Sequence, residues 1–303
     1  MRLSFASAPA TDSSTAKDAA QGAFQAPNDV RVAMVVEQMW QPVPGGSGTY
    51  ITNLAHSLRA QGVKVAGIAA RRSHNDPGSS AVGLETMPVR YANLPRPALY
   101  ESWNRLHSPL AEAILPASDL VHATTWAVPP TRKPLVVTVH DLAFLRNPEH
   151  FTKRGNSYFR KSLQRTIKEA QAVIVPSQAT ADDCYEAGID SERVHVIPHG
   201  VSVQEVSASQ IDLFRTAYGL SRPYVLWTGT REPRKNLPGL LHAFSRIAGE
   251  FPQLDLVLVG PSGWGDDAVE RQLIQAIGTS RVHVLGHLAQ DTLQQAYAGA
   301  RAF

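Results

Sequence analysis

Short β-branched runs alternate with helical patterns from Val30 to the end of the chain, and this alternation constrains the fold more than any other feature. Several of the runs are continuously apolar, which is typical of a parallel sheet covered by helices on both faces. Strands that alternate with helices form βαβ units, so the sequence predicts an α/β fold with doubly wound sheets. In the first part of the chain the predicted strands are 30–37, 63–70, 86–91, 120–123, 135–139, 172–175 and 194–197, and the helical patterns include 49–60 and 155–170.

The alternation breaks once, at a polar stretch near residues 201–209, and then resumes. Its second part predicts strands at 224–229, 254–259 and 282–285, with helices near 237–250 and 269–277. We therefore predict a Rossmann-like N-terminal lobe over 29–203, a linker over 204–220 and a second lobe over 221–303. Residues 300–303 resemble the start of another strand. Since each βαβ unit needs about 30 residues, we expect the second lobe to be incomplete.

Composition excludes several classes of protein. The single cysteine, Cys184, excludes an intrachain disulfide framework and a zinc site built from cysteines, and it fits the cytoplasm. The 29 Lys and Arg residues exceed the 26 Asp and Glu residues too little to indicate nucleic-acid binding. Residues 1–28 lack the apolar segment of a secretory signal, so we expect a disordered tail there. The longest apolar runs have about five residues, whereas a membrane-spanning helix needs about 20.

A glycine-rich turn follows the first predicted strand and leads into a helix. Gly45 and Gly46 lie in this turn, where backbone N–H groups can approach a ligand and the helix start favours an anion. We interpret the turn as a phosphate contact, with a tight capped loop as the alternative. Ile51 replaces the last glycine of a dinucleotide-binding fingerprint, and the second strand ends in Arg71 and Arg72 rather than an acidic residue. This pattern disfavours NAD and leaves NADP open.

Three histidines lie at or just past the ends of predicted strands of the first lobe. His140 lies just past an apolar strand, at the edge where open α/β sheets bind ligands, and its imidazole can hydrogen-bond a substrate hydroxyl. A structural histidine beside a turn is the alternative. For His122 and His199 we favour structural roles, the latter in a rigid turn between the lobes. Ser177 opens a helix and is interpreted as its N-cap, because no nucleophile-elbow motif surrounds it.

A basic segment follows the first strand of the second lobe. Arg234 and Lys235 lie between this strand and the next helix, where cations and a helix start together favour an anion. We interpret the segment as a second phosphate site, with a solvated loop capped by Asn236 as the alternative. Gly260 opens another loop after the next strand.

A second basic segment lies in the first lobe. Residues 146–168 hold seven Lys and Arg residues, and Phe159, Leu163 and Ile167 recur every four positions. This pattern predicts a basic amphipathic helix. A solvated face is the default interpretation, and binding of a phosphorylated acceptor or an anionic membrane surface is the alternative.

Taken together, these motifs resemble family-4 glycosyltransferases over about residues 30–303, most specifically in the segment Pro233-Arg-Lys-Asn236. The segments that carry the resemblance are 44–50, 139–142, 196–201, 229–236, 256–260 and 284–287. The resemblance implies the two-lobed GT-B fold and a nucleotide-diphospho-sugar bound between the lobes. It also implies that the sugar is transferred to the hydroxyl of a glycan, lipid or small molecule. This transfer would retain the anomeric configuration and need no metal or other cofactor.

The resemblance also assigns roles to residues. His140 would contact the transferred sugar, and Arg234 and Lys235 would neutralise the leaving diphosphate. Arg160 and Lys161 are candidates for acceptor binding. The remaining candidates, all on the donor side, are Gly45, Gly46, Gly229, Gly260 and His287.

Family members continue past a strand like 300–303 with a glycine-rich loop and two glutamates eight residues apart, a segment that this sequence does not include. We therefore expect a chain truncated before that segment. Two other functions stay open: a non-catalytic nucleotide-binding short form and an NADP-dependent oxidoreductase.

Overall fold

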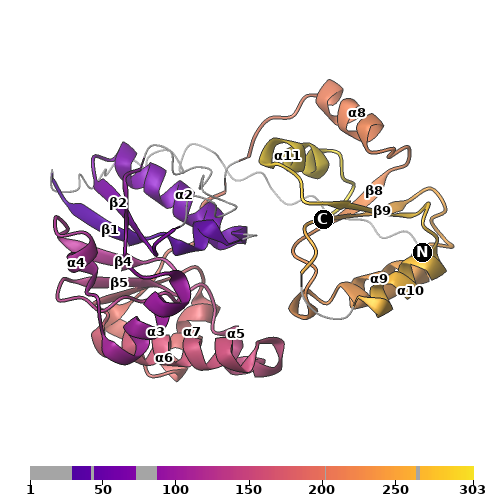
Figure 1. Cartoon of the computed structure of the whole chain (residues 1–303). Coiled ribbons are helices and arrows are strands. Elements are labelled where there is room, and N and C mark those ends of the chain that lie inside the picture. The colour runs from indigo at the N-terminus through magenta and orange to yellow at the C-terminus, as the bar shows by residue number, and fades with distance from the viewer. Residues whose placement is uncertain (1–28, 42–43, 73–86, 202, 264–266) are drawn as a thin grey trace.

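A parallel seven-stranded sheet forms the first lobe in the computed structural model, which describes residues 29–41, 44–72, 87–201, 203–263 and 267–303 (Figure 1). The strand order is β3-β2-β1-β4-β5-β6-β7, and it reverses direction between β1 and β4, the kind of position where open α/β sheets bind ligands. The strands are β1 (Arg31–Val35), β2 (Lys64–Ala69), β3 (Val89–Tyr91), β4 (Leu120–Ala123), β5 (Leu135–Thr138), β6 (Ala172–Val175) and β7 (Val194–Val196). The seven predicted strands are confirmed. The predicted tail, residues 1–28, lies outside the described residues.

Helices cover both faces of this sheet, and the packing of β1 shows why its sequence is continuously apolar. Val32 and Met34 belong to a buried cluster with α2, whereas Ala33 and Val35 belong to clusters on the opposite face. The helices are α2 (Gly45–Ala60), α3 (Arg96–Leu106), α4 (Ala111–Ile114), α5 (Ala143–Arg146), α6 (Lys153–Glu169) and α7 (Gln178–Glu186), with short 3-10 turns η1 (Glu37–Trp40), η2 (Pro148–His150) and η3 (Ser191–Arg193). Helix α7 is capped as predicted, because the Ser177 hydroxyl accepts from the Thr180 amide at 3.2 Å.

The second lobe is a smaller parallel sheet of order β10-β9-β8 (Figure 1). Helices α9 and α10 lie on one side of the sheet, and α8 and α11 lie on the other. The elements are α8 (Ala208–Ala217), β8 (Tyr224–Thr228), η4 (Pro233–Lys235), α9 (Leu237–Ile247), β9 (Asp255–Val259), α10 (Ala268–Ile277), β10 (Val282–Gly286) and α11 (Gln290–Ala298). No helix in the described ranges has both the length and the apolar composition needed to cross a membrane.

Two boundaries differ from the sequence-based prediction. The segment 204–220 is not only a linker, because it contains α8, whose Phe214 is 2% exposed and packs in the core of the second lobe. Helix α2 begins at Gly45 and not at Thr49, so the glycines form its first turn. At the other end of the chain, Ala302 forms a parallel bridge with Val225 of β8, as the strand-like residues 300–303 predicted.

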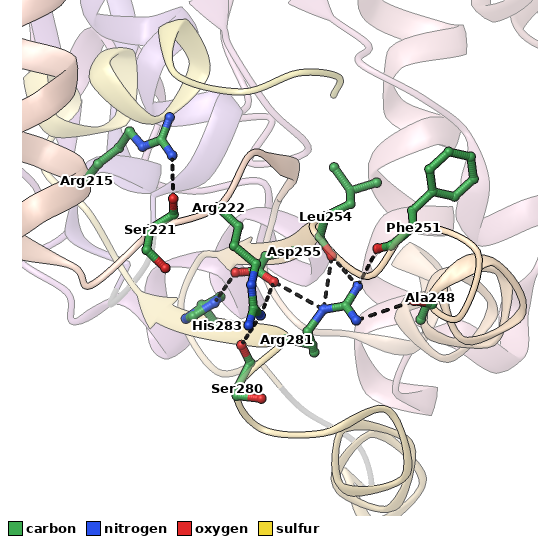
Figure 2. Close-up of polar contacts among 10 residues, drawn as sticks. All are labelled: Arg215, Ser221, Arg222, Ala248, Phe251, Leu254, Asp255, Ser280, Arg281 and His283. Carbon is green, nitrogen blue, oxygen red and sulfur yellow. Dashed lines mark hydrogen bonds and ion pairs between the residues drawn. The ribbon is translucent and has the colours of Figure 1, made fainter.

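A buried ion network holds the amino ends of the second sheet together (Figure 2). Asp255, the first residue of β9, is 2% exposed. One of its carboxylate oxygens lies 3.2 Å from Arg222 Nη1 and 3.2 Å from Arg281 Nε, and the other lies 3.0 Å from His283 Nε2. Arg281 also donates to the Phe251 carbonyl at 2.8 Å. These contacts join the amino-terminal ends of β8, β9 and β10, and the residues just before β8 and β10, through one carboxylate.

Candidate functional site

His140 lies two residues past β5, at the carboxyl edge of the first sheet. Its ring meets Tyr50 of α2 edge to face, with 5.0 Å between centroids. The Tyr50 ring also packs on His199, which follows β7, at 4.9 Å. Tyr50, which the sequence analysis did not single out, thus joins two of the three histidines, and its position one turn into the glycine-rich helix is the signal that could have found it.

Hydrogen bonds define the state of His140. Its Nε2 lies 3.0 Å from the Thr124 carbonyl oxygen, which can only accept, so Nε2 carries the hydrogen. In the neutral ring Nδ1 is then an acceptor, and it lies 3.3 Å from Nε2 of His199, which donates. Burial lowers the pKa of His140, and the Thr124 carbonyl opposes this effect. The half-buried ring is therefore mainly neutral near pH 7 and suited to hydrogen bonding with a hydroxyl.

His122 occupies the core beneath this cluster. It is 5% exposed, and its Nε2 lies 2.8 Å from Thr138 Oγ1, which in turn lies 2.9 Å from the Tyr50 hydroxyl. Burial, with a smaller effect of nearby His140, lowers the pKa of His122 to about 4. His122 thus sits in the structural position that the sequence favoured.

Acidification should destabilise the first lobe through His122. The pKa of an unfolded histidine is about 6.5 and the folded value is about 4, so between these pH values the unfolded state binds more protons. Stability therefore falls as the pH drops through this window, by about 3 kcal/mol in total. We expect urea denaturation to show a smaller loss between pH 7 and 4 for His122→Gln, which keeps a side-chain partner for Thr138. Equal losses in the two proteins would contradict this assignment.

Gly45 and Gly46 open α2 beside the same edge of the sheet. Among the described residues no side chain caps this helix start, and the first amides of a helix have no partner within the helix. Both glycines are exposed, and a Cβ built on either would meet no atom within 4 Å. Ser47, the next residue, lines the same cavity as His140. The helix start is thus accessible to an anion from the side where His140 lies.

One of the two arginines that left NADP open, Arg72, is already engaged. Arg72 forms an ion pair with Glu37, which is 1% exposed and also accepts from the Ala70 amide at 2.7 Å. The Arg72 guanidinium lies over the Trp40 ring, 4.9 Å from its centroid. Since Glu37 and Trp40 hold this cation against the first lobe, Arg72 is not poised for a ribose 2′-phosphate, and of the two arginines only the exposed Arg71 still supports the oxidoreductase interpretation.

A cavity of about 970 Å³ opens beside His140. It is lined by residues after β4 and β5 and by α3 and α6, including Arg96, Trp126, Tyr158 and Lys161. A second cavity of about 690 Å³ lies along α6 and includes Arg160 and Lys161. All residues that line either cavity belong to the first lobe. The first cavity thus brings together His140 and Lys161, whereas Arg160 lines only the second, and neither cavity includes Arg234 or Lys235.

Glycines cross closely at the carboxyl edge of the second sheet. The Gly229 amide donates to the Val259 carbonyl at 2.9 Å, and the Gly260 amide donates to the Gly286 carbonyl at 2.8 Å. A Cβ at Gly260, where φ is +140°, would lie 1.9 Å from the Gly229 carbonyl oxygen, so only glycine fits there. His287 directly follows Gly286, the last residue of β10, and is exposed. Three candidate donor residues, Gly229, Gly260 and His287, therefore lie at one edge.

Arg234 and Lys235 lie in η4, beside this edge, and both are exposed. Arg234 Nη2 donates to Glu232 at 2.8 Å, whereas Lys235 forms no ion pair with any described carboxylate. Asn236 caps α9 by accepting from the Gly239 amide at 3.3 Å. The cap that the sequence offered as the alternative is thus present, and the two cations beside it still face solvent. Among the described residues no cluster of three or more His, Cys, Asp or Glu side chains is arranged to hold a metal ion.

Comparison with known proteins decides the family. Residues 44–205, more than half of the chain, match the model of Glycosyltransferase Family 4, and residues 211–303 match that of Glycosyl transferases group 1. The chain belongs to glycosyltransferase family 4. The structure resembles that of Anabaena Alr3699/HepE in complex with UDP and glucose, with a TM-score of 0.67 and 24% identity over 89% of this chain and 72% of that one. The mostly parallel two-sheet architecture is therefore the GT-B fold, as predicted.

Curated relatives of this family-4 chain act on sugars. It is 26% identical to O-antigen chain mannosyltransferase B of Escherichia coli over 69% of this chain and 56% of the relative. It is 29% identical to alpha-maltose-1-phosphate synthase of Mycolicibacterium smegmatis over 76% of this chain and 60% of the relative. The chain thus spans less than two thirds of the length of either relative.

Proposed function

We propose that this family-4 chain transfers a sugar from a nucleotide-diphospho-sugar to an acceptor hydroxyl, with retention of configuration and without a metal. The observation that carries the proposal is the exposed pair Arg234 and Lys235 beside the glycine crossing of Gly229 and Gly260. The solved complex of Anabaena Alr3699/HepE with UDP and glucose supports a donor of this class. The mannosyltransferase relative from Escherichia coli supports transfer of a hexose.

The proposed chemistry follows from where charge develops. The acceptor oxygen forms a bond to the anomeric carbon as the bond from that carbon to the diphosphate breaks, and the acceptor proton passes to a leaving phosphate oxygen on the same face. Negative charge grows on the diphosphate, and Arg234 and Lys235 stabilise it most strongly in the transition state. The exposed amides at Gly45 and Gly46 and the neutral ring of His140 would contact the diphosphate and the transferred sugar.

The acceptor side is proposed to be the cavity beside His140, with Lys161 as a contact there and Arg160 as a contact in the adjoining cavity. The acceptor can be a glycan, a lipid or a small molecule. Contact of α6 with an anionic membrane and a cytoplasmic location both stay predictions from the sequence.

Nucleotide binding tests the proposal directly. We expect UDP or GDP to raise the melting temperature, because a ligand at about 100 times its Kd stabilises the folded state by about 2.7 kcal/mol, and NADPH to leave it unchanged. Transfer to a sugar acceptor, followed by NMR of the anomeric proton, then tests retention, and addition of EDTA tests independence of metal. Stabilisation by NADPH alone would overturn the proposal, and nucleotide binding without transfer would favour the non-catalytic alternative.

A further inference from the structure

The two cavities of the first lobe adjoin along α6. Asn104, Phe151, Ser157 and Lys161 line both. The first cavity contains His140, and the second extends along the helix as far as Lys168 and Glu169. At 1.5 Å per residue, the helix advances about 16 Å between positions 157 and 168. The two cavities therefore adjoin on the flank of the lobe, and together they are called the α6 groove.

Positive charge in the second cavity is not balanced by the protein. Lys153, Arg160, Lys161 and Lys168 are exposed there, and within the described ranges none of the four forms an ion pair with a carboxylate. The one acidic side chain of that cavity, Glu169, lies 3.7 Å from Nε of buried Arg165. Four like charges along one wall repel one another, and an anion with several oxygens relieves this repulsion.

Arg160 is held in place by a buried amide. Asn156, which is buried, donates through Nδ2 to the Phe144 carbonyl at 2.9 Å, and its Oδ1 accepts from Arg160 Nε at 2.7 Å. The amide orientation is therefore fixed, and it leaves both terminal nitrogens of the Arg160 guanidinium for another acceptor. An oriented guanidinium beside lysine charges suits a phosphate group.

The first cavity has a different chemistry. It carries acidic as well as basic side chains, Asp141 and Glu101 among them, and Tyr100 stacks on Tyr158 at 5.3 Å. Six of its 23 lining residues are aromatic: Tyr100, Trp126, Phe144, Phe151, Tyr158 and Phe159. Aromatic faces and mixed polar groups suit a sugar ring better than a phosphate.

We infer that this groove binds a phosphate-bearing acceptor in one orientation, with the phosphate at Arg160, Lys161 and Lys168 and the reacting hydroxyl in the cavity beside His140. This inference rests on the proposed function, because it concerns the acceptor of that reaction. The phosphate can belong to a lipid-linked glycan or to a soluble sugar phosphate, and both share the same phosphate ester.

Calorimetric titration with inorganic pyrophosphate tests the inference. We expect the double variant Arg160→Gln with Lys161→Gln to bind pyrophosphate about tenfold or more weakly at one class of sites. The donor-side double variant Arg234→Gln with Lys235→Gln should retain that class. Arg132→Gln with Lys133→Gln removes two exposed neighbouring cations outside both cavities and serves as the matched control. Melting curves confirm that all three variants fold.

Unchanged pyrophosphate binding in Arg160→Gln with Lys161→Gln would overturn the inference. This outcome is distinguishable from a failure of the proposed function, in which the unmodified chain would not bind UDP or GDP. Farnesyl phosphate and mannose 1-phosphate, titrated separately, then distinguish a lipid source of the phosphate from a soluble one. Binding to phosphatidylglycerol vesicles that pyrophosphate does not compete with would make this face a membrane surface and would also overturn the inference.

Discussion

Replacing Asp255 with asparagine is expected to lower the free energy of unfolding of the second lobe by about 3–5 kcal/mol, the cost of breaking a buried ion pair. Asp255 is 2% exposed and is the shared partner of Arg222, Arg281 and His283. A neutral amide would leave the guanidinium of Arg281, which is mostly buried, without its counter-charge. Hydrogen exchange of amides in β8, β9 and β10, followed by mass spectrometry, reports the stability of this lobe separately from the first.

An exposed pair in the same lobe provides the control. Asp267, at the N-cap of α10, and Arg271 of this helix form an ion pair about one helical turn apart and largely in solvent. Asp267→Asn removes the same charge as Asp255→Asn, yet we expect a change within about 0.5 kcal/mol, because exposed helical pairs contribute little. Equal losses in the two variants would show that burial of Asp255 is not what makes its network stabilising.

Lys235→Ala is expected to weaken binding of a nucleoside diphosphate by roughly 1.5–3 kcal/mol, or about 10- to 100-fold. Lys235 is exposed beside the glycine crossing and is not paired with any carboxylate in the described part of the chain. Its charge is therefore available to a diphosphate, whereas Arg234 must first exchange its contact with Glu232. Titration calorimetry with UDP and with GDP measures the effect.

Arg246→Ala is the matched control for this second experiment. Arg246 is an exposed cation in the last turn of α9, at the opposite end of the helix from Lys235. Its removal lowers the net charge of the lobe equally, so any general electrostatic attraction of the nucleotide falls to a similar extent in both variants. We expect Arg246→Ala to retain its affinity. A Lys235→Ala protein that binds UDP and GDP as tightly as the unmodified chain would contradict the donor site.

Local patterns predicted the elements of this fold well where they reflect burial. Strands β4 and β6 have the predicted bounds, Leu120–Ala123 and Ala172–Val175, because a short apolar run between polar residues admits few alternatives. Helix α8 was missed because polar and apolar residues are equally frequent in its sequence and Phe214 is its one buried residue. Helix α2 begins earlier than predicted, at Gly45, although glycine disfavours helices. Gly48 is required in it for close packing, because a Cβ there would lie only 2.4 Å from the Pro44 side chain.

Partnerships between distant residues were not predictable in the same way. Arg72 pairs with Glu37, 35 positions earlier in the chain, and nothing in the sequence near either residue indicates the other. The Tyr50 contacts with His140 and His199 likewise join α2 to the ends of β5 and β7. Each of these contacts depends on the order of strands in the sheet.

The sequence by itself determined the parallel α/β architecture in two lobes, and it placed glycines, His140 and Arg234 with Lys235 at the ends of strands. Only the tertiary structure decided what these residues meet: the neutral, doubly hydrogen-bonded ring of His140, the engaged Arg72, the carboxylate network of Asp255 and the basic groove along α6. The physical reason is that hydropathy periodicity reports which face of an element is buried. Which distant residue such a face or strand end contacts depends on strand order and helix packing. Hydropathy periodicity encodes neither of these.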